Sequence, residues 1–138
     1  LTISVWLLAF SLFIFFSLAA VKRQAELVDA VKAGKLKIVG RGYHPDDLGV
    51  VSQMATASGL VSVLVITLYL SSDAVTEIYQ RPEALWGVTP VLLFWISRVV
   101  FKAHRGEMHD DPIVFAVKDK VSMVCGLLIA GFAVFASL

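Results

Sequence analysis

The sequence contains a single cysteine and few charged residues for a chain of 138 residues. Charged residues make up 17% and hydrophobic residues 58%, whereas soluble domains have about 25% and 45–50%. Cys125 lies inside an apolar stretch, which excludes a disulfide framework and a cysteine-based metal site. The composition also excludes a soluble enzyme and a disordered chain. We expect no nucleic-acid partner.

Long uncharged stretches are the main feature that the sequence does contain. Residues 1–21, 48–72 and 121–138 carry no charge, and a bilayer-spanning helix needs roughly 20 apolar residues. Another apolar segment, between residues 72 and 121, is shorter and reaches bilayer length only by continuing past Arg98. The sequence therefore predicts an all-α, polytopic transmembrane helical bundle with helices at about 1–21, 48–72, 84–101 and 112–138.

The basic residues are distributed unevenly between the connections. Eleven of the 12 Lys and Arg residues belong to the first connection or flank the third, and only Arg81 lies between the second and third helices. The positive-inside rule then places the connections 22–47 and 102–111 in the cytoplasm. We expect an integral membrane protein of a bacterial inner membrane, with the active-site loops on the cytoplasmic side.

Four further expectations concern the chain and its helices. The chain begins with Leu inside an apolar run, which suggests a fragment that lacks its N-terminal part. Pro90 should kink the third helix, and the first helix should continue past the membrane and stop near Gly34. Small residues that let helices approach closely form one stripe on the second helix and one on the fourth. These residues are Ala55, Ser58, Gly59 and Ser62, and Ser122, Gly126 and Ala130.

The first connection opens with Lys22 and Arg23, followed by Glu26, which is four residues after Lys22. The two cations could anchor the helix at the membrane surface. Alternatively, they could clamp a phosphate, with Glu26 orienting them or binding Mg²⁺. Later in the connection, Arg41 and Tyr43 could contact a ligand, whereas Asp46 or Asp47 should cap the second helix.

The third connection contains the densest group of polar residues. Arg98, Lys102 and Arg105 have the spacing of one basic stripe at a helix end. Asp111 followed by Pro112 predicts the start of the fourth helix. Oxygen ligands suit Mg²⁺, so a hard-metal site is one option for Glu107, His109 and Asp110.

Lys118, Asp119 and Lys120 fall about 10 Å into that predicted helix, because each residue adds about 1.5 Å. Ionisable residues at such depth usually face a bundle interior or a wet cavity. If the bilayer boundary lies at Val121, the same residues are merely interfacial.

Taken together, these segments resemble the C-terminal half of a UbiA-superfamily membrane transferase, in particular the branch with decaprenyl-phosphate phosphoribosyltransferase and its HAD-fused relatives. The resemblance covers nearly the whole chain. It rests on Lys-Arg-x-x-Glu-Leu at 22–27, on Arg-Gly-Tyr at 41–43, and on the segment from Arg98 to Lys120 that ends in Lys-Asp-Lys. It implies that the four helices are the last four of nine around a cavity, and that the N-terminal half, with a first acidic motif, is missing.

The resemblance also implies an activity and roles for individual residues. The reaction would be transfer to or from polyprenyl (pyro)phosphate lipids, with Mg²⁺ and cations stabilising a departing pyrophosphate. The second motif is usually acidic, and Lys22 and Arg23 at that position suit a phosphoribosyl donor and a lipid-phosphate acceptor. The implied catalytic residues are Lys22, Arg23, Glu26 and Asp119. The implied substrate-binding residues are Arg41, Tyr43, Arg98 and Lys118, and the implied metal ligands are Glu26, Asp110 and Asp119.

The residues alone are also compatible with a second function. The chain could be a non-catalytic membrane module, such as a transporter half or an assembly subunit, in which the charges serve only topology.

Overall fold

A computed structural model of the chain describes residues 5–34, 44–108 and 111–138. Three of the predicted site residues, Arg41, Tyr43 and Asp110, lie outside the described residues, and so does His109. The predictions for these four residues therefore stay predictions.

Four long helices make up most of the described chain. They are α1 (Val5–Lys32), α2 (Leu48–Leu70), α4 (Val88–His104) and α6 (Lys120–Ser137). Short elements connect them: η1 (Pro45–Asp47), α3 (Asp73–Thr76), η2 (Pro82–Gly87) and α5 (Pro112–Lys118). Four stretches are long and apolar enough to cross a membrane, the third running from Pro82 to His104, and no strand occurs among the described residues. The predicted all-α transmembrane class is thus confirmed.

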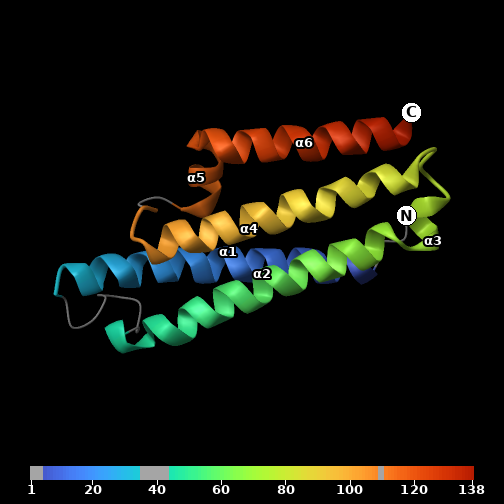
Figure 1. The fold of residues 1–138 in the computed structure, drawn as a ribbon. Helices are drawn as coiled ribbons and strands as arrows, with labels where there is room; N and C mark the ends of the chain where they lie inside the picture. The colour runs from blue at the N-terminus through green and yellow to red at the C-terminus, as the bar shows by residue number, and fades with distance from the viewer. Residues whose placement is uncertain (1–4, 35–43, 109–110) are drawn as a thin grey trace.

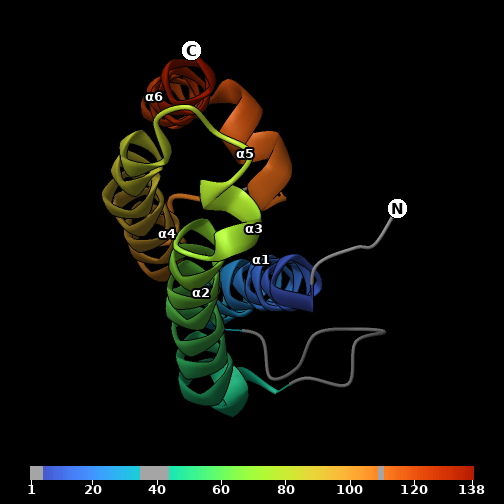
Figure 2. The same ribbon diagram turned by 90° about the vertical axis from the view of Figure 1, so that its right-hand side faces the viewer.

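The four long helices lie side by side in a bundle (Figures 1 and 2). α1 packs along α2, α4 packs against both, and α6 lies on the far side of α4. α1 begins and α6 ends at the same end of the bundle, while α1 ends, α2 begins and α4 ends at the opposite end. We call this opposite end the charged end, because it holds the ion pairs described below.

The core lies where α1, α2 and α4 meet. Leu27, Ala55, Val99 and Ala103 are among its fully buried members. The small residues on α2 permit this close packing, because a Cβ added at Gly59 would lie 2.8 Å from a methyl carbon of Ile96 on α4. The close-packed stripe predicted for the second helix is therefore confirmed.

One helix boundary agrees with the sequence and another differs. α1 runs past the apolar stretch to Lys32, and Gly34 follows it with a φ of 72°, as predicted. The third helix begins at Val88 after a 3₁₀ turn, and not at residue 84. Pro90 consequently lies in the first turn of α4, where a missing N–H costs no hydrogen bond, so the reason for expecting a kink disappears.

The single helix predicted for residues 112–138 is wrong. The chain forms α5, then adopts an extended conformation at Asp119 (φ −81°, ψ 122°), and then begins α6. α5 projects away from the line of α6 toward α1 (Figures 1 and 2). The break has a physical cause, since the Asp119 carboxylate accepts a hydrogen bond from the Ser122 N–H and so starts a new helix.

Candidate functional site

Lys22 and Arg23 lie on adjacent faces of α1 near the charged end. Glu26 pairs with Arg23, whose Nη1 is 2.9 Å from Oε1, and not with Lys22 as the four-residue spacing suggested. Lys22 points instead toward the start of α5, where its Nζ lies 3.4 Å from Oδ2 of Asp111. The Lys22 and Asp111 side chains are 42% and 37% exposed, so a solvated ligand can reach this pair.

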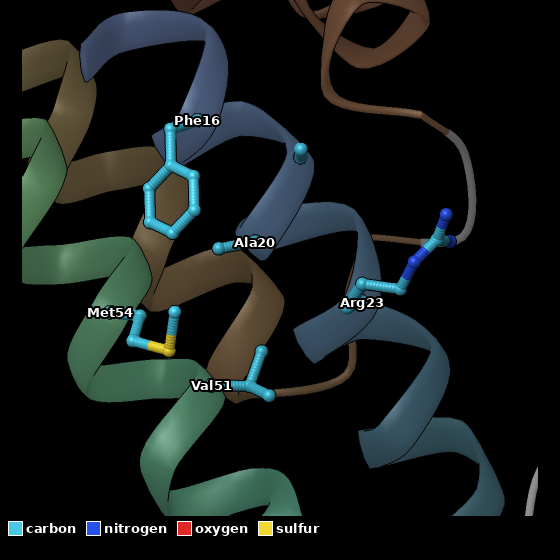
Figure 3. A pocket seen from close by; sticks show the side chains of 6 residues that line it. Phe16, Ala20, Arg23, Val51 and Met54 are labelled. Carbon is cyan, nitrogen blue, oxygen red and sulfur yellow. The ribbon is translucent and has the colours of Figure 1, made fainter. Parts of the chain in front are cut away.

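Arg23 also borders a cavity of about 160 Å³ between α1 and α2. The other walls are apolar side chains or small residues: Phe16, Ala19, Ala20, Val51 and Met54. Figure 3 shows the guanidinium of Arg23 turned away from the Phe16 and Met54 side chains, so that its aliphatic part completes the wall. The site thus combines an apolar groove with one cation, Arg23, at its edge, an arrangement that suits an anionic headgroup attached to a hydrocarbon chain.

One polar side chain beside these cations, Gln24, was missed by the sequence analysis. Gln24 is only 1% exposed, and neither its amide nitrogen nor its amide oxygen has a hydrogen-bond partner among the described residues. Oε2 of Glu26 is likewise buried and without a partner there. The sequence carried one signal for Gln24, because it stands seven residues after Ser17 on the buried face of α1.

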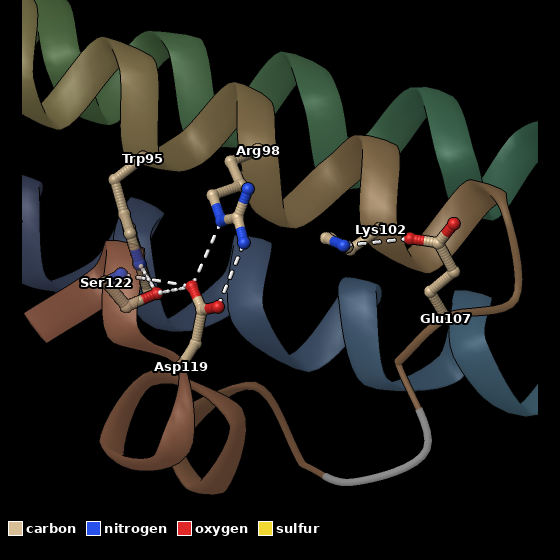
Figure 4. Close-up of polar contacts among 6 residues, drawn as sticks. All are labelled: Trp95, Arg98, Lys102, Glu107, Asp119 and Ser122. Atoms are coloured by element: carbon tan, nitrogen blue, oxygen red, sulfur yellow. Dashed lines mark hydrogen bonds and ion pairs between the residues drawn. The ribbon is translucent and has the colours of Figure 1, made fainter.

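A second polar cluster joins α4 to the break between α5 and α6 (Figure 4). Nε and Nη2 of Arg98 donate to the two oxygens of Asp119 at 3.0 and 2.9 Å. The hydroxyl of Ser122 donates to the same carboxylate at 2.8 Å and accepts from the Trp95 indole at 2.8 Å. Both carboxylate oxygens of Asp119 therefore already accept hydrogen bonds, and two parallel bonds hold Arg98 in place.

The electrostatics of Asp119 follow from these donors. The hydrogen bonds from Arg98, and then those from Ser122, lower the pKa of the Asp119 carboxyl to about 2. Partial burial raises the pKa; this influence is weaker than the hydrogen bonding from Arg98 but larger than either hydrogen bond from Ser122. The side chain thus stays a carboxylate at any physiological pH.

The basic stripe predicted on the third helix does not act as one surface. Lys102 donates to Glu107 at 2.9 Å, which lowers the pKa of the Glu107 carboxyl. The guanidinium of Arg105 stands over the Phe101 ring, 5.5 Å from the ring centroid. The Arg105 carbonyl in turn accepts from Nζ of Lys32, which ties the end of α1 to the end of α4.

The predicted helix caps have different outcomes. Asp111 caps α5 as expected, since its Oδ1 accepts from the Ile113 N–H at 2.9 Å and Pro112 occupies the first turn. Asp47 precedes α2 but makes no side-chain cap bond. Because the 3₁₀ turn η1 holds Asp47 in a helical conformation, its carboxylate reaches back to the N–H of His44 at 2.9 Å.

The described residues do not fit a magnesium site by themselves. No three His, Cys, Asp or Glu side chains gather among them, and the Asp119 oxygens are occupied by Arg98 and Ser122. The free Oε2 of Glu26 is one available oxygen. Mg²⁺ needs several oxygen ligands in octahedral geometry, so further donors would have to come from outside the described residues.

Comparisons with known proteins extend over nearly the whole chain. It is 39% identical over 137 residues to the uncharacterized protein y4nM of Sinorhizobium fredii, matching 99% of this chain and 27% of that protein. It is 36% identical over 131 residues to the nodulation protein NoeC of Azorhizobium caulinodans, matching 93% of this chain and 42% of NoeC. No family profile and no solved structure matches the chain. The chain spans about a quarter of the length of y4nM and about two fifths of the length of NoeC.

Proposed function

We propose that the chain is the C-terminal part of an integral membrane transferase of the UbiA type that acts on polyprenyl (pyro)phosphate lipids. One observation carries this proposal: the 42% exposed Lys22 and the half-buried Arg23 stand where α1 leaves its apolar stretch, and Arg23 borders an apolar groove between α1 and α2. A long isoprenoid with a phosphate at its end has the matching chemistry. The chain would lie against apolar side chains, and the phosphate would lie at the cations.

The reaction that suits these residues is pyrophosphate displacement. An oxygen of the lipid phosphate attacks the anomeric carbon of a phosphoribosyl pyrophosphate, the bond from that carbon to the pyrophosphate oxygen breaks, and pyrophosphate leaves with the electron pair. Lys22, Arg23 and Lys118 stabilise the negative charge on the phosphates. Glu26 orients Arg23 through its 2.9 Å ion pair. Mg²⁺ is an expected cofactor, and oxygen ligands beyond Glu26 would have to come from outside the described residues.

The test uses the full-length protein with a polyprenyl phosphate and phosphoribosyl pyrophosphate, and it measures pyrophosphate release. Lys22→Gln and Arg23→Gln each remove a charged hydrogen bond worth about 1.5–3 kcal/mol, so kcat/KM should fall roughly ten- to a hundredfold. Lys35→Gln, in the same basic connection but outside the motif, is the matched control. Normal turnover in both Gln variants, or no turnover in the wild type with Mg²⁺ present, would overturn the proposal.

The orientation of the bundle is part of the proposal. With the charged end in the cytoplasm, cysteines at Arg105 should react only from the cytoplasmic side and cysteines at Glu77 only from the other side, in a Cys125→Ala background. The basis is the excess of basic residues at the charged end. Labelling of both positions from one side would contradict both the orientation and the four crossings.

The alternative function is a non-catalytic membrane module, and one observation favours it. Several cations at the charged end already have carboxylate partners, as in the pairs of Arg98 with Asp119 and of Lys102 with Glu107. Such pairs can serve only to hold helices together and to fix topology. In that case the substitutions at Lys22 and Arg23 would leave every ligand-dependent measurement unchanged.

A further inference from the structure

The short helix α5 has a property that its length does not explain. Seven residues are too few for a helix that is stable in water by itself, because the cost of nucleation outweighs the few hydrogen bonds gained. They are also too few to cross a bilayer. Contacts with the rest of the chain must therefore hold α5 in place.

The first of these contacts lies at its N-terminal end. One oxygen of Asp111 caps α5 by accepting from the Ile113 N–H, and the other faces the ammonium group of Lys22 on α1. Pro112, the next residue, is fully buried. The start of α5 is thus fixed against α1.

The C-terminal end repeats the same arrangement with a different helix. Asp119 ends α5, caps α6 through the Ser122 N–H, and binds Arg98 of α4 with both oxygens. The Arg98 and Asp119 side chains are only 23% and 14% exposed, so this pair is better shielded from solvent than the pair of Lys22 and Asp111. Trp95 supports it through its bond to Ser122.

Between the two aspartates, Phe115 packs against the core formed by α1, α2 and α4. α5 is therefore held at its start, its middle and its end. In Figure 4 the Arg98 and Trp95 side chains reach from α4 to the turn at Asp119, directly where α5 ends.

We infer that α5 is a strap that positions Lys22, with Asp111 as the direct contact and the Arg98–Asp119 pair as the anchor that keeps the strap docked. Arg98 and Asp119 are then positioning residues and do not touch phosphate or metal. The part of this inference that concerns Lys22 rests on the proposed function, whereas the docking of α5 does not.

The docking is tested by hydrogen–deuterium exchange of the full-length protein in lipid nanodiscs. Asp119→Asn and Arg98→Gln should raise exchange of the α5 amides at least tenfold and leave the α2 amides unchanged, while Arg98→Lys, which keeps the charge but loses the paired bonds, should be intermediate. The matched control is Asp29→Asn, an exposed aspartate on α1. If Asp119→Asn does not fold, Trp95→Phe provides a milder variant and should raise α5 exchange by a smaller factor. Wild-type exchange in these variants would overturn the strap.

The positioning role is tested by transfer kinetics. Asn caps helices as well as Asp does, so Asp111→Asn keeps the cap and removes only the charge that faces Lys22. It should lower kcat more than it raises KM, and the double variant with Lys22→Gln should be no slower than Lys22→Gln alone. Fully additive losses would show that Asp111 acts independently and would overturn the positioning role. A wild type without transfer activity would defeat the proposed function, and the exchange experiment would still decide the strap.

Discussion

α2 and α6 have similar compositions but differ in how they pack in the fold. Both lack charge along the membrane-spanning part, and both carry a stripe of small residues. In α2 39% of the most apolar stretch is buried, against 17% in α6. The small residues of α2 lie between α1 and α4, whereas Gly126 and Ala130 of α6 are exposed in the described structure.

α6 is held mainly near its two ends. At the charged end Asp119 and Ser122 join it to α4, and at the other end Ala136 is buried beside Val75 and Leu85. The N–H of Arg81 also donates to the Ala136 carbonyl at 2.8 Å. A stripe of small residues therefore permits close packing between helices but does not produce it. A neighbouring helix must also lie close enough to contact the stripe, and contacts elsewhere along the chain determine whether it does.

The largest difference between the two helices is expected for glycine substitutions. Gly59→Leu should lower the free energy of unfolding by about 1–3 kcal/mol, the usual cost of overpacking. The added Cβ would meet Cγ2 of Ile96 at 2.8 Å and Oγ of Ser17 at 2.9 Å. Gly126→Leu is the matched control on α6, where an added Cβ would meet no described atom within 4 Å apart from the adjoining backbone of its own helix. Its effect should stay within about 0.5 kcal/mol. Reversible unfolding in mixed detergent measures both, and equal losses would contradict the comparison.

A smaller and pH-dependent effect is expected at the anchored end of α6. The carboxyl of Asp119 has a pKa of about 2 in the fold, against an ordinary value of 3.8. A lowered pKa stabilises the fold above the ordinary value, and this stabilisation is lost as pH falls through the lowered value. At about 1.4 kcal/mol per pKa unit, Asp119→Asn should cost about 2 kcal/mol at neutral pH.

The same variant should approach wild-type stability as pH falls toward 2, because the wild-type carboxyl then becomes protonated. Thermal unfolding of both proteins over a series of pH values measures this convergence. A stability difference that stays constant with pH would show that the charge of Asp119 does not hold this end of α6.

The smallest effect is expected for buried hydroxyl groups. Ser17→Ala removes a 2.7 Å hydrogen bond to the Ala55 carbonyl, which links α1 to α2. Hydrogen bonds between membrane helices average about 0.6 kcal/mol, so a loss of that size is expected. Within the described part of the chain the Ser137 hydroxyl donates to the Val134 carbonyl of its own helix α6, so Ser137→Ala should have no measurable effect. An equal loss at Ser137 would remove the distinction between the two helices.

Much of the fold could be predicted from the sequence because the constraints are local. Uncharged stretches of bilayer length predict spanning helices wherever they occur. Gly34 ends α1, and Asp111 with Pro112 starts α5, because cap chemistry depends only on neighbouring residues. The Lys22, Arg23 and Glu26 cluster was likewise visible, since three residues within one helical turn and a half must lie close together.

The tertiary structure alone decided which cation meets which carboxylate. Spacing within a helix suggested that Lys22 pairs with Glu26, yet the Lys22 ammonium faces Asp111, which comes from a distant part of the chain. Arg98 is separated from Asp119 by 21 residues, and its two bonds to that carboxylate accompany the break that divides the last predicted helix. Local sequence can supply the charges and the caps. The pairing of charges between helices depends on how the helices pack, and packing brings together residues that no local pattern relates.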